Sequence, residues 1–211
     1  MPSVDSVVLV PVKAFTAAKA RLAGVLSPGQ RADLARWSAA RVVAAAGELP
    51  VHVACDDDEV AEWATRHGAG IEWHPGVGLN EAVRRSVASL AGQGAARVVV
   101  AHGDLPRAHG LARLAQLAPA GGALLVPDHV GDGTNVTVVP AGAAFPFAYG
   151  PGSFRRHVSL AIAARLPLTV HRDALLALDL DVPTDLTHPL VQEVLPEWLP
   201  TNLANPHPNP A

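Results

Sequence analysis

The feature that most constrains the fold is an alternation between short runs of β-branched residues and longer, alanine-rich amphipathic segments. Such alternation is typical of an α/β layered domain. Because the run RVVVA at 97–101 is apolar throughout after its first residue, we expect a mainly parallel central sheet with helices on both faces. The runs predict strands at 7–12, 51–54, 97–101, 123–127, 134–139 and 167–170.

The segments between these runs predict helices. The clearest one begins at Ser27, where Pro28 suits the first helical position and Gln30 completes a capping box, and it extends to about Gly47. Its core face should consist of Leu34, Trp37, Val42 and Val43. Further helices are expected from the acidic run DDDEV to Gly68 and at 79–91, 109–118, 153–165 and 184–195.

Length and composition predict one domain, because 211 residues can bury a full core and no linker is visible. We assign 1–195 to a single domain and the proline- and asparagine-rich end, 196–211, to a tail. No apolar stretch approaches the roughly 20 residues of a membrane helix, and no signal-peptide pattern is present. The net charge of -3 argues against nucleic acids and anionic membranes as partners. With a single cysteine and therefore no internal disulfide, the chain fits the cytoplasm.

A basic cluster follows the first predicted strand. It contains Lys13, Lys19 and Arg21 without an acidic residue among them. The sequence has fourteen arginines but only these two lysines. A solvated surface explains many such clusters, but ligands of parallel sheets bind at the carboxyl ends of strands, which favours phosphate binding here. Because the chain has neither a P-loop nor a G-x-G-x-x-G fingerprint, side-chain charge would hold the phosphate.

Carboxylates follow other strand ends. Asp104 comes just after the run at 97–101, and Asp179 and Asp181 stand two positions apart in LDLDVP. Each of these aspartates, taken alone, is explained by a turn or a helix cap. Carboxylates that converge opposite a basic loop suit Mg²⁺ bound between the protein and substrate phosphates.

Two further stretches are polar for their context. PDHVGDGTN contains Thr134, and YGPGS contains Gly150 and Ser153 at the start of a predicted helix. The second stretch would offer free backbone N–H groups and a hydroxyl to an anion, although a plain turn with an N-cap explains it almost as well. The histidine spacing does not indicate zinc, acidic neighbours disfavour a nucleophilic Cys55, and no G-x-S-x-G elbow occurs.

Six motifs, in order, resemble the guanylyltransferase family of coenzyme F420 biosynthesis: VPVKAFTAAKARL, GLNEA, GDLP, PDHVGDGTN, YGPGSFRRH and LDLDVPTDL. The resemblance covers about residues 7–190. It implies a Rossmann-like nucleotidyltransferase fold of the GT-A-like type. It also implies transfer of GMP from GTP to phosphoenolpyruvate, 2-phospho-L-lactate or 3-phosphoglycerate, with pyrophosphate released. A composition typical of GC-rich bacteria favours phosphoenolpyruvate.

The resemblance also implies a role for each candidate residue. The nucleotide would be held by Lys13, Lys19, Arg21 and Asn80, the first three of which would act in catalysis with Asp104. Mg²⁺ would bind Asp104 with Asp179 or Asp181, and the phosphorylated three-carbon acid would bind Thr134, Gly150 and Ser153. DVPTDL replaces the usual DTPEDL and HGDLP the common PADLP, but the three aspartates are present. A homodimer is expected from relatives of the fold.

Two alternatives remain open. The first is another nucleotidyltransferase or glycosyltransferase of similar fold, such as a molybdenum-cofactor guanylyltransferase. Those enzymes usually open with a glycine-rich loop, and this chain has no glycine before Gly24. The second is a non-catalytic nucleotide-binding protein, which would not need a costly cluster of buried carboxylates.

Overall fold

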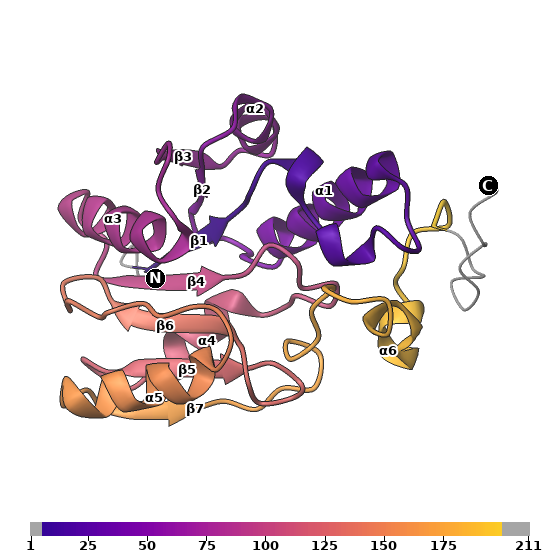
Figure 1. Ribbon diagram of the computed structural model, residues 1–211. Helices are drawn as coiled ribbons and strands as arrows, with labels where there is room; N and C mark the ends of the chain where they lie inside the picture. Colours follow the sequence, from indigo (N-terminus) through magenta and orange to yellow (C-terminus); the bar gives the residue numbers. More distant parts are fainter. Residues whose placement is uncertain (1–5, 200–211) are drawn as a thin grey trace.

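The computed structural model describes residues 6–199. Its centre is one seven-stranded sheet with the strand order β3-β2-β1-β4-β6-β5-β7 (Figure 1). Six strands agree with the predicted runs to within two residues at each end. The strands are β1 (Ser6–Pro11), β2 (Val51–Cys55), β3 (Gly70–Trp73), β4 (Arg97–Ala101), β5 (Ala123–Pro127), β6 (Thr134–Pro140) and β7 (Leu168–Val170).

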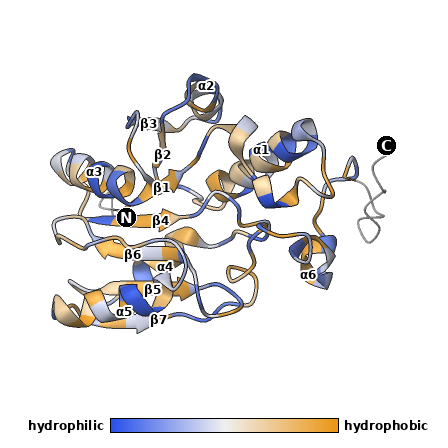
Figure 2. Cartoon of the chain, viewed as in Figure 1, coloured by the Kyte–Doolittle hydropathy of each residue, from blue (hydrophilic) through white to orange (hydrophobic). Residues whose placement is uncertain are grey.

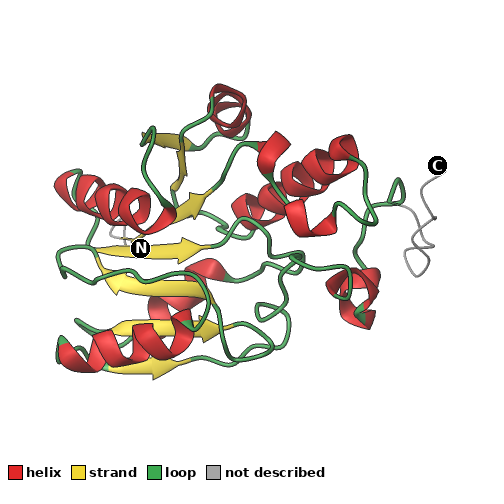
Figure 3. Cartoon of the chain, viewed as in Figure 1, coloured by secondary structure: helices red, strands yellow, loops and turns green. Residues whose placement is uncertain are grey.

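Helices connect and cover the strands, as Figure 3 shows. The longest, α1, starts with the predicted capping box: Ser27 Oγ accepts from the Gln30 N–H, and the Gln30 side chain accepts from the Ser27 N–H. The helices are α1 (Pro28–Ala44), α2 (Asp58–Arg66), α3 (Leu79–Gly92), α4 (Leu111–Leu117), α5 (Ser153–Ala163) and α6 (Pro189–Gln192), with short 3₁₀ turns at Phe15–Ala17, Ala20–Leu22 and Asp185–Thr187.

The helices lie on both faces of the sheet, as predicted. On one face, Val8 and Val10 of β1 pack with α1, α2 and α4. On the other face, Val7 and Leu9 pack against α3, and Ala161 of α5 packs beside β5 and β6. The central strands are therefore largely apolar on both sides, and β1, β5 and β6 are mostly orange in Figure 2.

One strand runs against the others, and it matters for the site. β6 is antiparallel to both of its neighbours, β4 and β5, whereas the other pairings are parallel. The first residue of β6, Thr134, consequently lies at the same edge of the sheet as the carboxyl ends of β4 and β5. Apolar periodicity predicts a strand but does not fix its direction, so this reversal was not expected.

Two other expectations need correction. The short edge strand β3 was not predicted, because GIEW contains a glycine and a glutamate, which are uncommon in strands. The structure nevertheless buries Glu72. The helix expected at 184–195 is wrong: that segment holds only a 3₁₀ turn and the four-residue α6, with Pro189 opening the second element.

The end of the described chain packs against the domain. Leu199, which the sequence assigns to the tail, is buried in a cluster with Leu22, Leu34 and Leu186. Residues 200–211 of the predicted tail lie outside the described residues. Within residues 6–199 no helix has both the length and the apolar character needed to cross a bilayer.

Candidate active site

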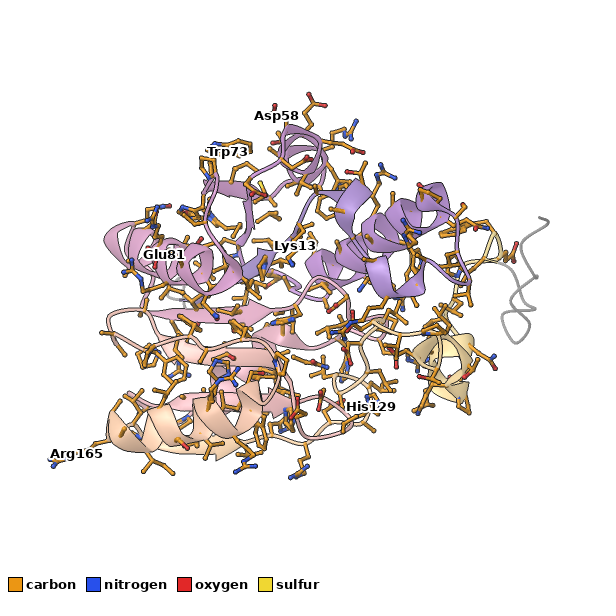
Figure 4. The ribbon with its side chains drawn as sticks, viewed as in Figure 1. Lys13, Asp58, Trp73, Glu81, His129 and Arg165 are labelled. Atoms are coloured by element: carbon orange, nitrogen blue, oxygen red, sulfur yellow. The ribbon has the colours of Figure 1, made fainter. Side chains whose placement is uncertain are left out.

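The candidate residues gather at the edge where the parallel strands end. In Figure 4, Lys13 lies beside the end of β1, and His129, which follows β5, lies toward the same edge. By contrast, Asp58 and Arg165 point away from the body of the molecule.

The centre of the basic loop is a contact between Lys19 and Asp104. Lys19 Nζ donates to Asp104 Oδ2 at 3.0 Å, across 85 positions of sequence, and the Lys19 side chain is only 7% exposed. Lys19 has a left-handed backbone with φ of 56°, a conformation that costs energy for a residue with a side chain. The loop therefore holds this lysine against the carboxylate at some energetic cost.

The other two cations differ from Lys19 in their surroundings. Arg21 pairs with Asp181 at 2.6 Å, and both side chains are largely exposed. Lys13 is exposed and makes no side-chain hydrogen bond or ion pair with another residue in 6–199. The structure thus brings Lys19 to Asp104 and Arg21 to Asp181, and it leaves Lys13 available.

A loop crossing the strand ends places the two aspartates Asp179 and Asp181. Three hydrogen bonds anchor it: the Leu180 N–H donates to Asp104 O, the His129 N–H donates to Ala177 O, and Asn135 Nδ2 donates to Leu176 O. The buried side chains of Leu178 and Leu180 alternate with the aspartates. The segment is not a strand, but its alternating burial places the two aspartates on one side of the chain.

Negative charge accumulates around Asp179. Burial and the nearby carboxylates of Asp104, Asp185 and Asp128 raise the pKa of Asp179 to about 7. Burial alone would also raise the pKa of Asp104, but Lys19 and His102 outweigh burial and keep the pKa of Asp104 below its usual value. A second cation beside Asp179 would relieve the remaining repulsion.

These carboxylates fit a metal ion that is shared with substrate. Asp104 Oδ1 is buried and lacks a hydrogen-bond partner within the described chain, so one hard oxygen ligand is free. Among residues 6–199, no three His, Cys, Asp or Glu side chains are placed to hold a metal ion without other ligands. Mg²⁺ commonly binds through one or two carboxylates and completes its shell with substrate phosphates and water.

Hydroxyl groups form a second part of the site. Thr134 begins β6, Ser153 begins α5, and their oxygens are 3.4 Å apart with both residues 2% exposed. The loop before β6 is held in shape by Asp128, which accepts from the N–H groups of Gly131, Asp132 and Gly133.

The start of α5 does not offer the free N–H groups expected from its sequence. The Gly152 N–H donates to the Asp132 carboxylate, the Phe154 N–H to Asp132 O, and the Ser153 N–H to Gly150 O. Asp132 therefore occupies the place at which an anion was expected. The glycines have a conformational role instead, since Gly150 has φ of +114°.

Asn80, expected on the nucleotide side, also contacts the loop before α5. Its Oδ1 accepts from the Tyr149 N–H at 2.6 Å, and its Nδ2 donates to Tyr149 O at 3.3 Å. Asn80 thus joins the first turn of α3 to the residue before Gly150.

Sequence reasoning missed several residues of this region, above all His157. It lies one helical turn after Ser153 and is fully buried, with Nδ1 3.0 Å from Thr134 Oγ1. The signal was present in the spacing SFRRH, because residues four apart share a helix face. Asp132 and Tyr149 were also missed, since their roles depend on contacts with backbone atoms remote in sequence.

The fold and the site define a class. The structure is similar to a putative nucleotide-diphospho-sugar transferase from Desulfovibrio desulfuricans, with a TM-score of 0.68 at 20% identity over 86% of this chain and 84% of that one. It is also similar to a CMP:2-keto-3-deoxy-manno-octonic acid synthetase complexed with CTP, with a TM-score of 0.57 at 14% identity over 87% and 95% of the two chains. The chain has the nucleotide-diphospho-sugar transferase fold of nucleotidyltransferases.

Sequence comparison gives the family. The model of the family described as guanylyl transferase CofC like matches residues 6–192. A phosphoenolpyruvate guanylyltransferase of Sphaerobacter thermophilus is 35% identical, over 86% of this chain and 90% of its own length. One of Rubrobacter xylanophilus is 36% identical, over 84% and 90% respectively. The chain belongs to the CofC-like guanylyltransferase family, which confirms the resemblance stated from its motifs.

Proposed function

We propose that this protein transfers the GMP unit of GTP to the phosphate of phosphoenolpyruvate, releasing pyrophosphate, as a step of coenzyme F420 biosynthesis. The names of its relatives support this substrate pair. The observation that carries the proposal is the Lys19–Asp104 contact, which joins the basic loop after β1 to the carboxylate after β4. 2-Phospho-L-lactate is the alternative acid, and it differs only at the central carbons.

The reaction needs little covalent help from the protein. A phosphate oxygen of the acid attacks the α-phosphorus of GTP, an anhydride bond forms, and the bond to the β-phosphate breaks, with pyrophosphate carrying away the electron pair. Because the second pKa of a phosphate monoester is about 6, the nucleophile is already ionised and no general base is required. The site must instead position two polyanions and stabilise the leaving group.

The basic loop meets the electrostatic requirement. We assign Lys13, Lys19 and Arg21 to the phosphates of GTP and of the leaving pyrophosphate. Lys19 is held rigidly at Asp104, whereas exposed Lys13 is able to follow a phosphate as it moves. A compact ammonium on a flexible stem suits that movement better than a planar guanidinium.

We assign Mg²⁺ to Asp104 and Asp179. Asp181 is paired with Arg21 and would bind the ion only if that pair opens. Bound there, the ion would act as a Lewis acid on the phosphates of GTP. The free Asp104 Oδ1 and the raised pKa of Asp179 support this pair of ligands.

The acid substrate is assigned to Thr134, Gly150 and Ser153. The hydroxyls are donors for an anionic oxygen, and Gly150 gives the loop its shape. Asn80, through its two bonds to Tyr149, would connect nucleotide binding at α3 to this loop. A cytoplasmic location, expected from the single cysteine, and a homodimer, expected from relatives of the fold, complete the proposal.

The test is an assay of pyrophosphate release by the purified protein with GTP, MgCl₂ and each of phosphoenolpyruvate, 2-phospho-L-lactate and 3-phosphoglycerate separately. We expect release with phosphoenolpyruvate. Release with another acid alone would correct the substrate, and no release with any acid would refute the proposal. CTP in place of GTP is the control for the nucleotide.

A further inference from the structure

His157 is a buried histidine without a role in the chemistry proposed above. It lies on α5 one turn after Ser153, is 0% exposed, and is surrounded by the rings of Phe145 and Tyr149, with ring centroids at 5.7 and 4.8 Å. Both of its ring nitrogens contact the loops that form the hydroxyl part of the site. Because each ring nitrogen has one such contact, the donor and the acceptor in both hydrogen bonds can be assigned.

The contact at Nε2 fixes the protonation of the ring. Nε2 lies 2.9 Å from the backbone nitrogen of Ala148, and a backbone N–H donates only, so Nε2 must accept and carries no proton. Burial, with smaller effects of His102 and Arg156, lowers the pKa of His157 to about 4. The ring is therefore neutral at neutral pH, and its single N–H proton is on Nδ1.

The contact at Nδ1 then has a known direction. Nδ1–H donates to Thr134 Oγ1 over 3.0 Å, and the Ser153 hydroxyl lies 3.4 Å from the same oxygen. Three protons are present in this group, one from His157 and one from each hydroxyl. Two bonds, His157 to Thr134 and one between the hydroxyls, use two of them. Whichever hydroxyl donates to the other, one proton is left for an acceptor outside the group.

We propose that His157 is a positioning residue that makes the Thr134–Ser153 pair a hydrogen-bond donor toward an anionic oxygen of the acid substrate. The inference rests on the proposed function, because it deepens the assignment of this pair to the acid. Since His157 supplies a proton and takes none, the pair offers a net donor. Carboxylate and phosphate oxygens, which only accept when ionised, match that polarity.

Two variants separate positioning from packing. In His157→Asn, the amide nitrogen occupies about the place of Nδ1 and still donates to Thr134, but no group reaches Ala148. In His157→Gln, the amide oxygen occupies about the place of Nε2 and accepts from Ala148, but the donor to Thr134 is lost. Each variant therefore loses the ring and one of the two hydrogen bonds, which makes them matched controls for stability.

We expect His157→Gln to raise the KM for phosphoenolpyruvate about tenfold or more, the effect of losing one hydrogen bond to a charged group. The KM for GTP should change less than about twofold, and His157→Asn should keep a KM for the acid within about threefold of the wild type. Equal losses in both variants, or losses that follow Tm alone, would overturn the proposal.

Nitrogen NMR of the wild-type protein gives a readout that needs neither activity nor variants. With ¹⁵N-labelled histidine, His157 should show a protonated Nδ1 and an unprotonated Nε2 at neutral pH. The opposite tautomer, or a charged ring, would overturn the proposal. Failure of the pyrophosphate assay would instead refute the proposed reaction, so the two failures are distinguishable.

Discussion

The two parts of the site are built on different principles. The charged part is formed by Lys13, Lys19 and Arg21 with the facing aspartates. It ranges from the largely buried Lys19–Asp104 pair to the Arg21–Asp181 pair, whose side chains are 67% and 46% exposed. The hydroxyl part, formed by Thr134, Ser153 and His157, is neutral and almost fully buried. The charged part is suited to charge that moves during a reaction, whereas the hydroxyl part is fixed before a ligand arrives.

The largest expected effect is on the charged part. Asp104→Asn keeps the size of the side chain but removes the charge that faces Lys19 and the free oxygen proposed for Mg²⁺. Mg²⁺-dependent turnover should fall roughly 10²-fold or more, as when a donor to transition-state charge is lost. Steady-state kinetics measure the fall, and circular dichroism should show an unchanged fold. An active variant would show that the metal assignment is wrong.

Lys19→Met tests whether the charged part depends on its central pair for stability. Removal of the ammonium leaves Asp104 without its partner, so the free energy of unfolding should decrease by about 2 to 3 kcal/mol. Lys13→Met is the matched control: its side chain is exposed and should change stability by less than about 0.5 kcal/mol. Denaturant titration measures both, and equal losses would remove the distinction between the two lysines.

Acid should weaken the hydroxyl part through His157. Its pKa of about 4 lies below the ordinary value of 6.5, so between these values the unfolded chain binds a proton that the folded chain does not. Stability from this group is therefore complete above pH 6.5 and decreases as pH falls. The difference in unfolding free energy between the wild type and His157→Asn should shrink by about 2 kcal/mol from pH 7 to pH 5. A constant difference would contradict a neutral His157.

The smallest effect concerns the kind of cation. Lys13→Arg keeps the charge on an exposed side chain, so stability should not change, but turnover should decrease several-fold because a planar guanidinium follows a moving phosphate less well. Arg165→Lys, on a side chain that points away from the molecule in Figure 4, is the control and should have no effect. Wild-type kinetics of Lys13→Arg would mean that charge alone suffices.

The sequence predicts much of this arrangement for physical reasons. Apolar periodicity predicts six strands, and the capping box predicts the start of α1, because both depend on local pattern. Strand direction is not local, so the reversal of β6, which brings Thr134 to the site, was not predicted. The role of His157 and the occupied N–H groups before α5 depend on which donor meets which acceptor in three dimensions.

The proposed transfer of GMP to the phosphate of the acid can be observed directly by phosphorus NMR of the reaction. With GTP, phosphoenolpyruvate and MgCl₂, we predict that pyrophosphate appears together with two new, mutually coupled phosphorus signals from the anhydride joining GMP to the acid. Spectra in which the phosphoenolpyruvate signal persists unchanged, or in which GTP yields only free GMP, would contradict it.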